Sequence, residues 1–174
     1  AIGEMTYGAA RGLKDFIMIT LGTGVGSGIV INGQLVYGHD GFAGELGHTI
    51  VKRNNGRLCG CGRTGCLEAY CSATGVARTA REFLEIRKDE SMLRELPIED
   101  ITSKDVFDAA NAGDQLAKDV FEYTGTLLGE TFCDFTVFSS PQAIILFGGL
   151  AKSGEMLLKP LRNAMDKNMM GIFK

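Results

Sequence analysis

The sequence lacks several features that would point to particular classes of protein. It has no excess of basic residues, because 18 Lys and Arg stand against 21 Asp and Glu and give a formal net charge of −3. A nucleic-acid or anionic-membrane surface needs a basic patch, so the composition argues against both partners for this chain. No apolar run approaches the roughly 20 residues that a membrane-spanning helix needs. The first residues also lack the basic-then-apolar pattern of a secretory signal peptide.

The cysteines do not have the pattern of a disulfide framework. The chain has five of them, an odd number, and no secretory signal precedes them. Such thiols suit a reducing cytoplasm better than an oxidising compartment, and clustered thiols there more often bind a metal. We therefore expect a cytoplasmic protein.

Glycine is the residue in excess. It accounts for 24 of the 174 residues, against an average share of roughly 7%. The excess is concentrated in residues 22–65. Glycine allows tight turns and close approach of the backbone to a ligand. In this stretch we therefore expect the backbone either to turn tightly or to approach another group closely.

The order of the predicted elements indicates an α/β layered domain formed by residues 1–174. Short apolar segments predict strands over 14–21, 27–31, 34–38, 48–52 and 143–147, and longer amphipathic ones predict helices over 1–10, 72–89, 102–113, 114–138 and 155–165. Asn32-Gly33 is the preferred dipeptide of a type I′ hairpin turn. The sequence at 102–105, TSKD, resembles a capping box. Pro160 is expected to bend the last helix or to mark its start.

Cysteine and glycine alternate in the segment CGCGRTGC. Cys59, Cys61 and Cys66 supply three thiols in eight residues, and His48 precedes Cys59 with ten residues between them. Three thiolates and one imidazole form a closed tetrahedral set for structural zinc, which leaves no open position for activating water. The alternative is a group of unligated buried thiols. Cys71 could compete as a metal ligand with these cysteines, and His39 could compete with His48. Cys133 lies in an apolar predicted helix and is expected in the core.

The segment LGTGVGSG follows an apolar strand. Neither the dinucleotide pattern G-x-G-x-x-G nor the P-loop pattern ending in Gly-Lys-Ser/Thr fits it. The turn also leads back into a strand instead of opening a helix. A glycine-rich hairpin that carries the Thr23 hydroxyl can still surround a phosphate with backbone N–H groups. The other interpretation is a tight hairpin without a ligand, and the local pattern leaves both open.

Three stretches together resemble one family: LGTGVGSGIVINGQLVYGHDGFAGELGH, CGCGRTGCLEAY and AIILFGGLAKSG. They resemble the ROK family (repressors, open reading frames, kinases), especially its bacterial glucokinase-like sugar kinases, and the match covers nearly the whole chain. The most specific part is Gly-Glu-Leu-Gly-His together with the Cys/Gly loop and the glutamate that follows it. The resemblance implies the actin-like ATPase (ribonuclease H-like) fold, with this chain as its larger C-terminal lobe.

The resemblance also implies roles for individual residues. It places the second phosphate loop on Gly22, Thr23, Gly24 and Gly26, the adenosine-contacting turn on Gly148 and Gly149, the sugar contacts on Glu45, His48 and Glu68, and the zinc ligands on His48, Cys59, Cys61 and Cys66. One ring nitrogen of His48 would then bind zinc while the other faces the sugar. Outside this motif, Glu45 would read as a solvated loop charge and Glu68 as a helix residue favoured by the helix dipole.

The same resemblance places some of the machinery outside this chain. The family's catalytic Asp, in an Asn-Asp motif, and its first phosphate loop belong to the other lobe, and neither occurs in this sequence. The stretch that completes the family's last helices is also expected outside it. We therefore expect a fragment with no catalytic residue that is inactive alone.

The expected function of the parent protein is transfer of the γ-phosphoryl group of Mg-ATP to a hexose, glucose first, by a homodimer. Alternatives are a kinase for N-acetylmannosamine, N-acetylglucosamine or fructose, a sugar-sensing ROK-type repressor, and a zinc-stabilised interaction module without a ligand.

Overall fold

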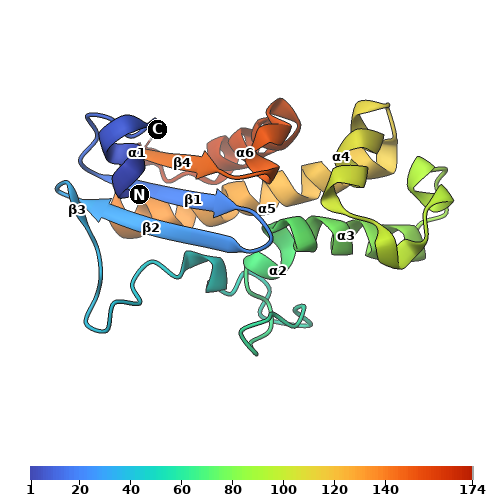
Figure 1. Ribbon diagram of the computed structural model, residues 1–174, viewed down its shortest axis with the longest axis horizontal. Helices are drawn as coiled ribbons and strands as arrows, with labels where there is room; N and C mark the ends of the chain where they lie inside the picture. Colours follow the sequence, from blue (N-terminus) through green and yellow to red (C-terminus); the bar gives the residue numbers. More distant parts are fainter. Residues whose placement is uncertain (174) are drawn as a thin grey trace.

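The sheet has four strands, and the computed structural model, which describes residues 1–173, places them in the order β3-β2-β1-β4 (Figure 1). The strands are β1 (Phe16–Leu21), β2 (Val25–Ile31), β3 (Gln34–Leu35) and β4 (Ala143–Phe147). Strand β2 is antiparallel to both of its neighbours, whereas β4 is parallel to β1. Parallel strands need a crossover connection, and here the helices between β3 and β4 provide it. The predicted mixed α/β architecture is confirmed.

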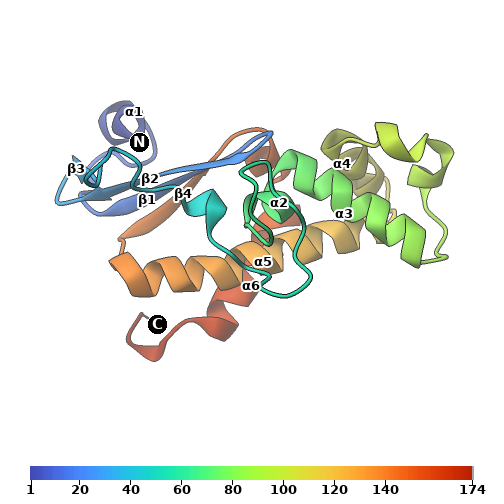
Figure 2. The ribbon, with the colours of Figure 1, turned by 90° about the horizontal axis from the view of Figure 1, so that it is seen from below.

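Strand β1 is covered on both faces, which explains its nearly continuous apolar sequence. Ile17 and Ile19 pack into the main core, and Phe16 belongs to a smaller cluster with side chains of α1 (Ile2–Tyr7). Figure 2 shows α1 on one side of the sheet, with α5 and α6 on the other. The sheet therefore sits between two layers of unequal size.

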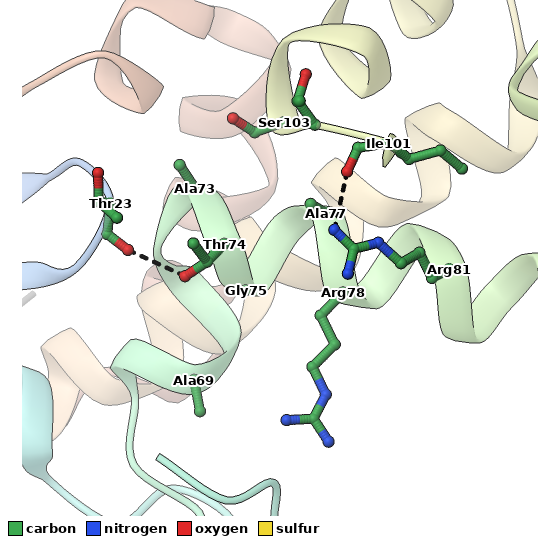
Figure 3. Close-up of a pocket in the computed structure, with 11 residues that line it drawn as sticks. Thr23, Ala69, Ala73, Thr74, Gly75, Ala77, Arg78, Arg81, Ile101 and Ser103 are labelled. Atoms are coloured by element: carbon green, nitrogen blue, oxygen red, sulfur yellow. Dashed lines mark hydrogen bonds between the residues drawn. The ribbon is translucent and has the colours of Figure 1, made fainter. Parts of the chain in front are cut away.

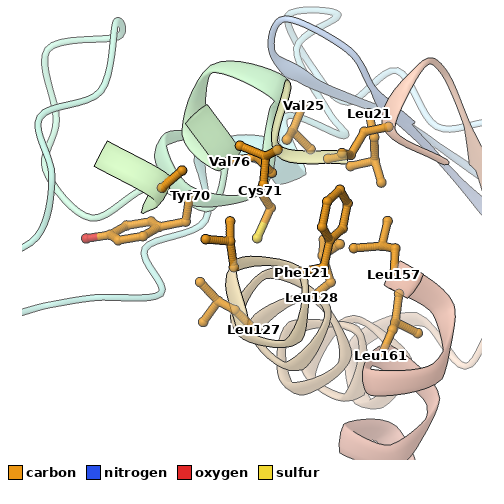
Figure 4. Close-up of a cluster of buried hydrophobic side chains, with 14 of the residues drawn as sticks. Leu21, Val25, Tyr70, Cys71, Val76, Phe121, Leu127, Leu128, Leu157 and Leu161 are labelled. Carbon is orange, nitrogen blue, oxygen red and sulfur yellow. The ribbon is translucent and has the colours of Figure 1, made fainter. Parts of the chain in front are cut away.

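The longest helix, α5 (Gln115–Ser139), packs against α6 (Glu155–Asn168), and both helices lie on the same side of the sheet. Phe121 points from α5 toward Leu21 of β1 and Leu157 of α6 (Figure 4), and all three side chains are buried. None of the described helices is long and apolar enough to cross a membrane.

The remaining helices extend from the sheet as a separate arm (Figure 1). They are α2 (Glu68–Cys71), α3 (Ala73–Ile86) and α4 (Ser103–Asn111), with two short 3₁₀ turns before α4. The predicted capping box is confirmed at α4, where the Thr102 hydroxyl accepts from the Asp105 N–H and the Asp105 carboxylate accepts from the Thr102 N–H. This bond pair fixes where the arm turns back toward the sheet.

The predicted strand at residues 48–52 is wrong. His48 ends a 3₁₀ turn, and Ile50 makes only one isolated bridge, to Cys66. The Val51 and Lys52 N–H groups both donate to the Gly65 carbonyl. The backbone of this segment is thus used to hold the Cys/Gly loop, so no sheet partner is needed.

Several predicted boundaries shift. Strand β2 begins at Val25 instead of residue 27, β3 is shorter than predicted, and the first helix ends at Tyr7. The helix predicted over 72–89 ends at Ile86, and Pro160 lies inside α6. The predicted hairpin turn is confirmed, because Asn32 and Gly33 have φ values of 52° and 74°, both positive as type I′ requires.

Candidate functional site

An open hollow of about 480 Å³ lies where the β1–β2 hairpin, the loop before residue 48 and the start of α2 meet. Its lining brings together residues that are far apart in the sequence: Thr20, Gly22, Gly24, Val25, Gly26, Glu45, His48, Glu68, Phe147 and Gly148. The three residues predicted to contact a sugar therefore share one hollow with all three glycines of the predicted phosphate loop.

Hydrogen bonds hold the turn between β1 and β2, residues 22–24, on both sides. The Gly22 N–H donates to the Gly24 carbonyl at 3.0 Å, and the Ala73 N–H donates back to the Gly22 carbonyl at 2.8 Å. Within the described part of the chain, the N–H groups of Thr23 and Gly24 donate to no acceptor. A turn with free N–H groups is the arrangement that binds anions such as phosphate.

Glu68 connects this turn to the cysteine loop. One carboxylate oxygen accepts from the Val25 N–H at 2.9 Å, and the other lies 3.6 Å from the Cys59 Sγ. A Cβ at position 24 would lie 2.5 Å from the Glu68 Oε2. Gly24 therefore leaves room for the carboxylate at this position, and a larger residue would displace it from the Val25 N–H.

Glu45 is exposed, and its loop is held by β2. The Ser27 hydroxyl contacts the Gly44 carbonyl and accepts from the Leu46 N–H at 3.0 Å. A Cβ at Gly47 would lie 2.1 Å from the Val25 carbonyl oxygen, so only glycine allows the loop to lie this close to the strand. The loop is thus fixed on both sides of Glu45.

His48, Cys59, Cys61 and Cys66 form a cluster whose ligand atoms all lie within 4.8 Å of one another. The His48 Nδ1 is 3.7 Å from the Cys59 Sγ, and the Sγ atoms of Cys61 and Cys66 are also 3.7 Å apart. Tetrahedral zinc with bonds of about 2.3 Å to sulfur separates its thiolates by about 3.7 to 3.8 Å. The donor set and its spacing therefore fit zinc.

The acidity of the three thiols differs within the cluster. Burial raises the pKa of Cys59, and burial raises the pKa of Cys66 to about 12. The backbone N–H of Arg63 lowers the pKa of Cys61. Without a cation, Cys59 and Cys66 are thus protonated at neutral pH, and a metal bound here would release their protons.

The competing ligands lie elsewhere. Cys71 is fully buried, and its thiol points toward α5, 3.8 Å from the Thr124 carbonyl oxygen. His39 is exposed beside Asp40. Cys133 lies buried on α5, as predicted.

Two of the predicted nucleotide-binding residues line neighbouring hollows instead. Thr23 borders a hollow of about 450 Å³ between α3 and the start of α4 (Figure 3), where the Thr74 hydroxyl donates to the Thr23 carbonyl at 3.0 Å. Gly149 borders one of about 250 Å³ with Lys104 of α4. Ser103 lines both. The predicted phosphate turn and adenosine turn thus face the same arm of helices.

Sequence reasoning missed several residues of this region. Ser27 reads as an ordinary strand residue, and Ser103 and Lys104 read only as part of a capping box. Arg57, whose side chain is 7% exposed, is not singled out by any motif in the sequence. No local pattern identifies these residues, because the hollows and loops that they contact are assembled from segments distant in the sequence.

The sequence is similar to those of sugar kinases and of a transcriptional regulator. A glucokinase of Halalkalibacterium halodurans is 43% identical over 167 residues, which are 95% of this chain and 51% of that protein. The DNA-binding transcriptional dual regulator NagC of Escherichia coli is 30% identical over 174 residues, 100% of this chain and 42% of the regulator. The chain spans about half the length of the curated relatives it matches.

A solved structure shares the fold. It is a ROK family glucokinase from Streptomyces griseus in complex with glucose and AMPPNP, with a TM-score of 0.88 and 34% identity over 99% of this chain and 56% of that one. The sheet and its helices are those of the actin-like ATPase fold. The sequence model of the ROK family matches residues 1–174. The chain therefore belongs to the ROK family.

Proposed function

We propose that this chain supplies the sugar-binding residues and part of the ATP-binding residues of a hexose kinase, with glucose as the first candidate substrate. The observation that carries the proposal is the shared hollow, in which Glu45, His48 and Glu68 lie beside the glycine turn. The glucose and AMPPNP bound to the related glucokinase support this choice of ligands.

The sugar would be held by acceptors at fixed positions. A carboxylate accepts hydrogen bonds from two hydroxyl groups at once, so Glu45 and Glu68 suit a polyol. The His48 Nε2, on the opposite side of the ring from the cysteine cluster, lies 3.9 Å from the Glu45 carboxylate. In this proposal the three groups would together bind and orient one sugar.

Zinc would have a structural role. His48, Cys59, Cys61 and Cys66 would hold it, and four protein ligands leave no position for a water nucleophile. Its effect would be to fix the imidazole of His48 and the loop that precedes Glu68, so that both groups are preorganised for the sugar. Cysteine ligands that form no disulfide would suit a reducing cytoplasm.

The reaction transfers a phosphoryl group from Mg-ATP. The bond between the γ-phosphorus and the β–γ bridging oxygen breaks, a bond to the sugar hydroxyl oxygen forms, and the hydroxyl proton leaves to a base. This chain would bind the phosphates with the free N–H groups of Thr23 and Gly24, and the nucleoside toward Gly148 and Gly149. Positioning and charge stabilisation dominate such reactions. The base, an Asp, is expected in the rest of the protein.

The test is sugar-dependent ADP formation by the full-length protein, over a panel of hexoses and N-acetylhexosamines with Mg-ATP. We expect strong turnover with one sugar, which names the substrate. Equal turnover without any sugar, or no turnover with every sugar, would contradict the proposal. Light scattering of the same sample tests the homodimer.

A second function is favoured by the 30% identity to NagC. In a sugar-sensing repressor the same hollow would bind a sugar without phosphorylating it. This function would be selected if one sugar raised the melting temperature of the full-length protein while no ADP formed. Sequence-specific DNA binding that the same sugar weakens would then establish it.

A further inference from the structure

We propose that Arg57 is a positioning residue that holds the phosphate turn and Glu68 in place from the far side of the α2–α3 corner. The corner is the segment 68–75, where α2 ends, Ser72 breaks the helix with extended backbone, and α3 begins. The kinetic part of this inference rests on the proposed function, whereas its structural part does not.

Three hydrogen bonds from the corner tie the phosphate turn and the start of β2 to the helical arm. The Ala73 N–H donates to the Gly22 carbonyl at 2.8 Å, and the Thr74 hydroxyl donates to the Thr23 carbonyl at 3.0 Å. The Glu68 carboxylate accepts from the Val25 N–H at 2.9 Å. A displacement of the corner would therefore move the turn and the proposed sugar contact together.

Arg57 spans the corner from the opposite side. Its Nη1 donates to the Ala69 carbonyl at 3.0 Å and to the Gly75 carbonyl at 3.2 Å, and these residues lie on either side of the break. Its Nη2 donates to the Thr79 hydroxyl at 2.9 Å, and the Glu82 carboxylate accepts from both Nε and Nη2. One planar group thus connects α2 to α3 across the break.

The guanidinium is itself held rigidly. The guanidinium carbon lies 4.4 Å from the ring centroid of Tyr70, and the backbone N–H of Arg57 donates to the Tyr70 hydroxyl at 2.8 Å. A buried cation is tolerated only when its donors are satisfied, and the planar fork of arginine meets several acceptors at once. Lysine carries the same charge at a single point and cannot bridge Ala69 and Gly75 in the same way.

Arg57 also connects the corner to the cysteine loop. It lies two positions before Cys59, and its carbonyl accepts from the Gly65 N–H at 2.8 Å. It lines a polar hollow of about 330 Å³ that the phosphate turn does not reach. Arg57 therefore touches neither proposed substrate, and its influence must pass through the corner.

The test is hydrogen exchange of the Val25 N–H in the full-length protein, for the wild type and the Arg57→Lys variant. We expect exchange at least about tenfold faster in the variant, because the carboxylate that protects this N–H loses its support. The buried stretch 124–132 of α5 is expected to keep its wild-type exchange. Unchanged exchange at Val25 in a folded Arg57→Lys protein would overturn the proposal.

Arg94→Lys is the matched control. The Arg94 guanidinium also bridges carbonyls, those of Leu84, Arg87 and Asp89, but lies on the arm away from the phosphate turn. It is expected to leave Val25 exchange unchanged. If Arg57→Lys does not fold, the double variant Tyr70→Phe, Thr79→Val withdraws two contacts of Arg57 at nearly constant volume, and the proposal then requires faster Val25 exchange in that protein.

Kinetics provide the second readout. Arg57→Lys is expected to raise the KM values for ATP and for the sugar together, by about tenfold each, and Arg94→Lys to change neither. If the wild type shows no turnover, the proposed function fails while the exchange experiment still decides the role of Arg57. If the wild type is active and only the exchange result is negative, the positioning role fails alone.

Discussion

At the scale of single residues, small side chains decide where the site's loops lie. Ser27 is one hydroxyl on β2, yet it contacts both the residue before Glu45 and the residue after it. Gly24 and Gly47 contribute by the absence of a Cβ, which lets Glu68 and the loop approach the hairpin. The proposed sugar contacts therefore depend on residues that themselves touch no sugar.

Replacing Ser27 by Ala tests this dependence. The loop that carries Glu45 loses two hydrogen bonds, so we expect the KM for the sugar to rise by about tenfold, equivalent to roughly 1.4 kcal/mol. The KM for ATP is expected to change little. Steady-state kinetics of the full-length protein measure both, with Ser139→Ala on α5 as a control that removes a hydroxyl bonded only to the Phe135 carbonyl. A sugar KM equal to that of the wild type would show that Ser27 does not hold the loop.

At the scale of elements, two contacts set how the helices are arranged. Asp114 caps α5 through the Ala117 N–H and also accepts from the Ser91 hydroxyl and the Met92 N–H. Gly125 and Gly129 let α5 and α6 approach closely, since a Cβ at either position would lie within 3 Å of α6. The first contact holds the arm to the central helix, and the second builds the core beneath the sheet.

The Asp114→Asn variant should lose stability in a pH-dependent way. Burial raises the pKa of Asp114, but the hydrogen bonds from Ala117, Ser91 and Met92 outweigh it and lower the pKa overall. The stabilisation is therefore present above the unfolded-state pKa of about 3.9 and is lost as the pH falls through the folded-state pKa.

We expect the variant to be less stable than the wild type by about 1 kcal/mol at pH 7 and equally stable at the lowest pH at which both proteins fold. Urea unfolding over this pH range gives the comparison. A difference that stays constant with pH would assign the effect to something other than the charge.

Replacing Gly129 by Ala should force α5 and α6 apart. The added Cβ would lie 2.3 Å from the Leu161 carbonyl oxygen and 2.7 Å from the Ala164 Cβ. We expect a loss of about 1–3 kcal/mol of unfolding free energy, as is usual for overpacking. Gly3→Ala on α1 is the control, because its Cβ would meet no atom within 4 Å and helical Ala is favoured over Gly by roughly 0.5–1 kcal/mol. In thermal unfolding, the melting temperature of Gly129→Ala should therefore fall below that of the wild type, and the melting temperature of Gly3→Ala should rise above it.

At the scale of the whole molecule, the cysteine cluster connects the site to the folding of its loop. We expect the purified protein to contain one zinc ion per chain, which metal analysis measures directly. Removal of the ion by a strong chelator is expected to lower the melting temperature and to weaken sugar binding, because His48 and Glu68 lose their fixed positions. Cys61→Ser is expected to act in the same direction. Full sugar affinity in a zinc-free protein would contradict this role.

The chain by itself is expected not to catalyse the reaction. It is proposed to supply sugar contacts and one phosphate turn, whereas the base is expected elsewhere in the protein. The comparison is between residues 1–174 and the full-length protein, both with Mg-ATP and the preferred sugar. We expect turnover only in the second sample. Sugar-dependent ADP formation by the first would show that this chain contains a complete site.

The sequence by itself determined the local features of this protein. Asn32-Gly33 has only one favourable hairpin geometry, the capping box uses side chains three residues apart, and the apolar segment of β1 has few alternatives to burial. Strand β4 is equally apolar in sequence, yet it is only partly buried, and Phe147 at its end is exposed. The cysteine spacing likewise predicts the grouping of the three thiols, because the intervening glycines let a short loop curl.

Only the tertiary structure decided the rest, since it depends on contacts between distant segments. Residues 48–52 are predicted as a strand from the sequence, yet the N–H groups of Val51 and Lys52 donate to the Cys/Gly loop. No motif in the sequence marks Arg57, yet α2 and α3 enclose it and supply its acceptors. A local pattern fixes what a segment can form, but burial and the choice of hydrogen-bond partner are set by whatever the fold brings beside it.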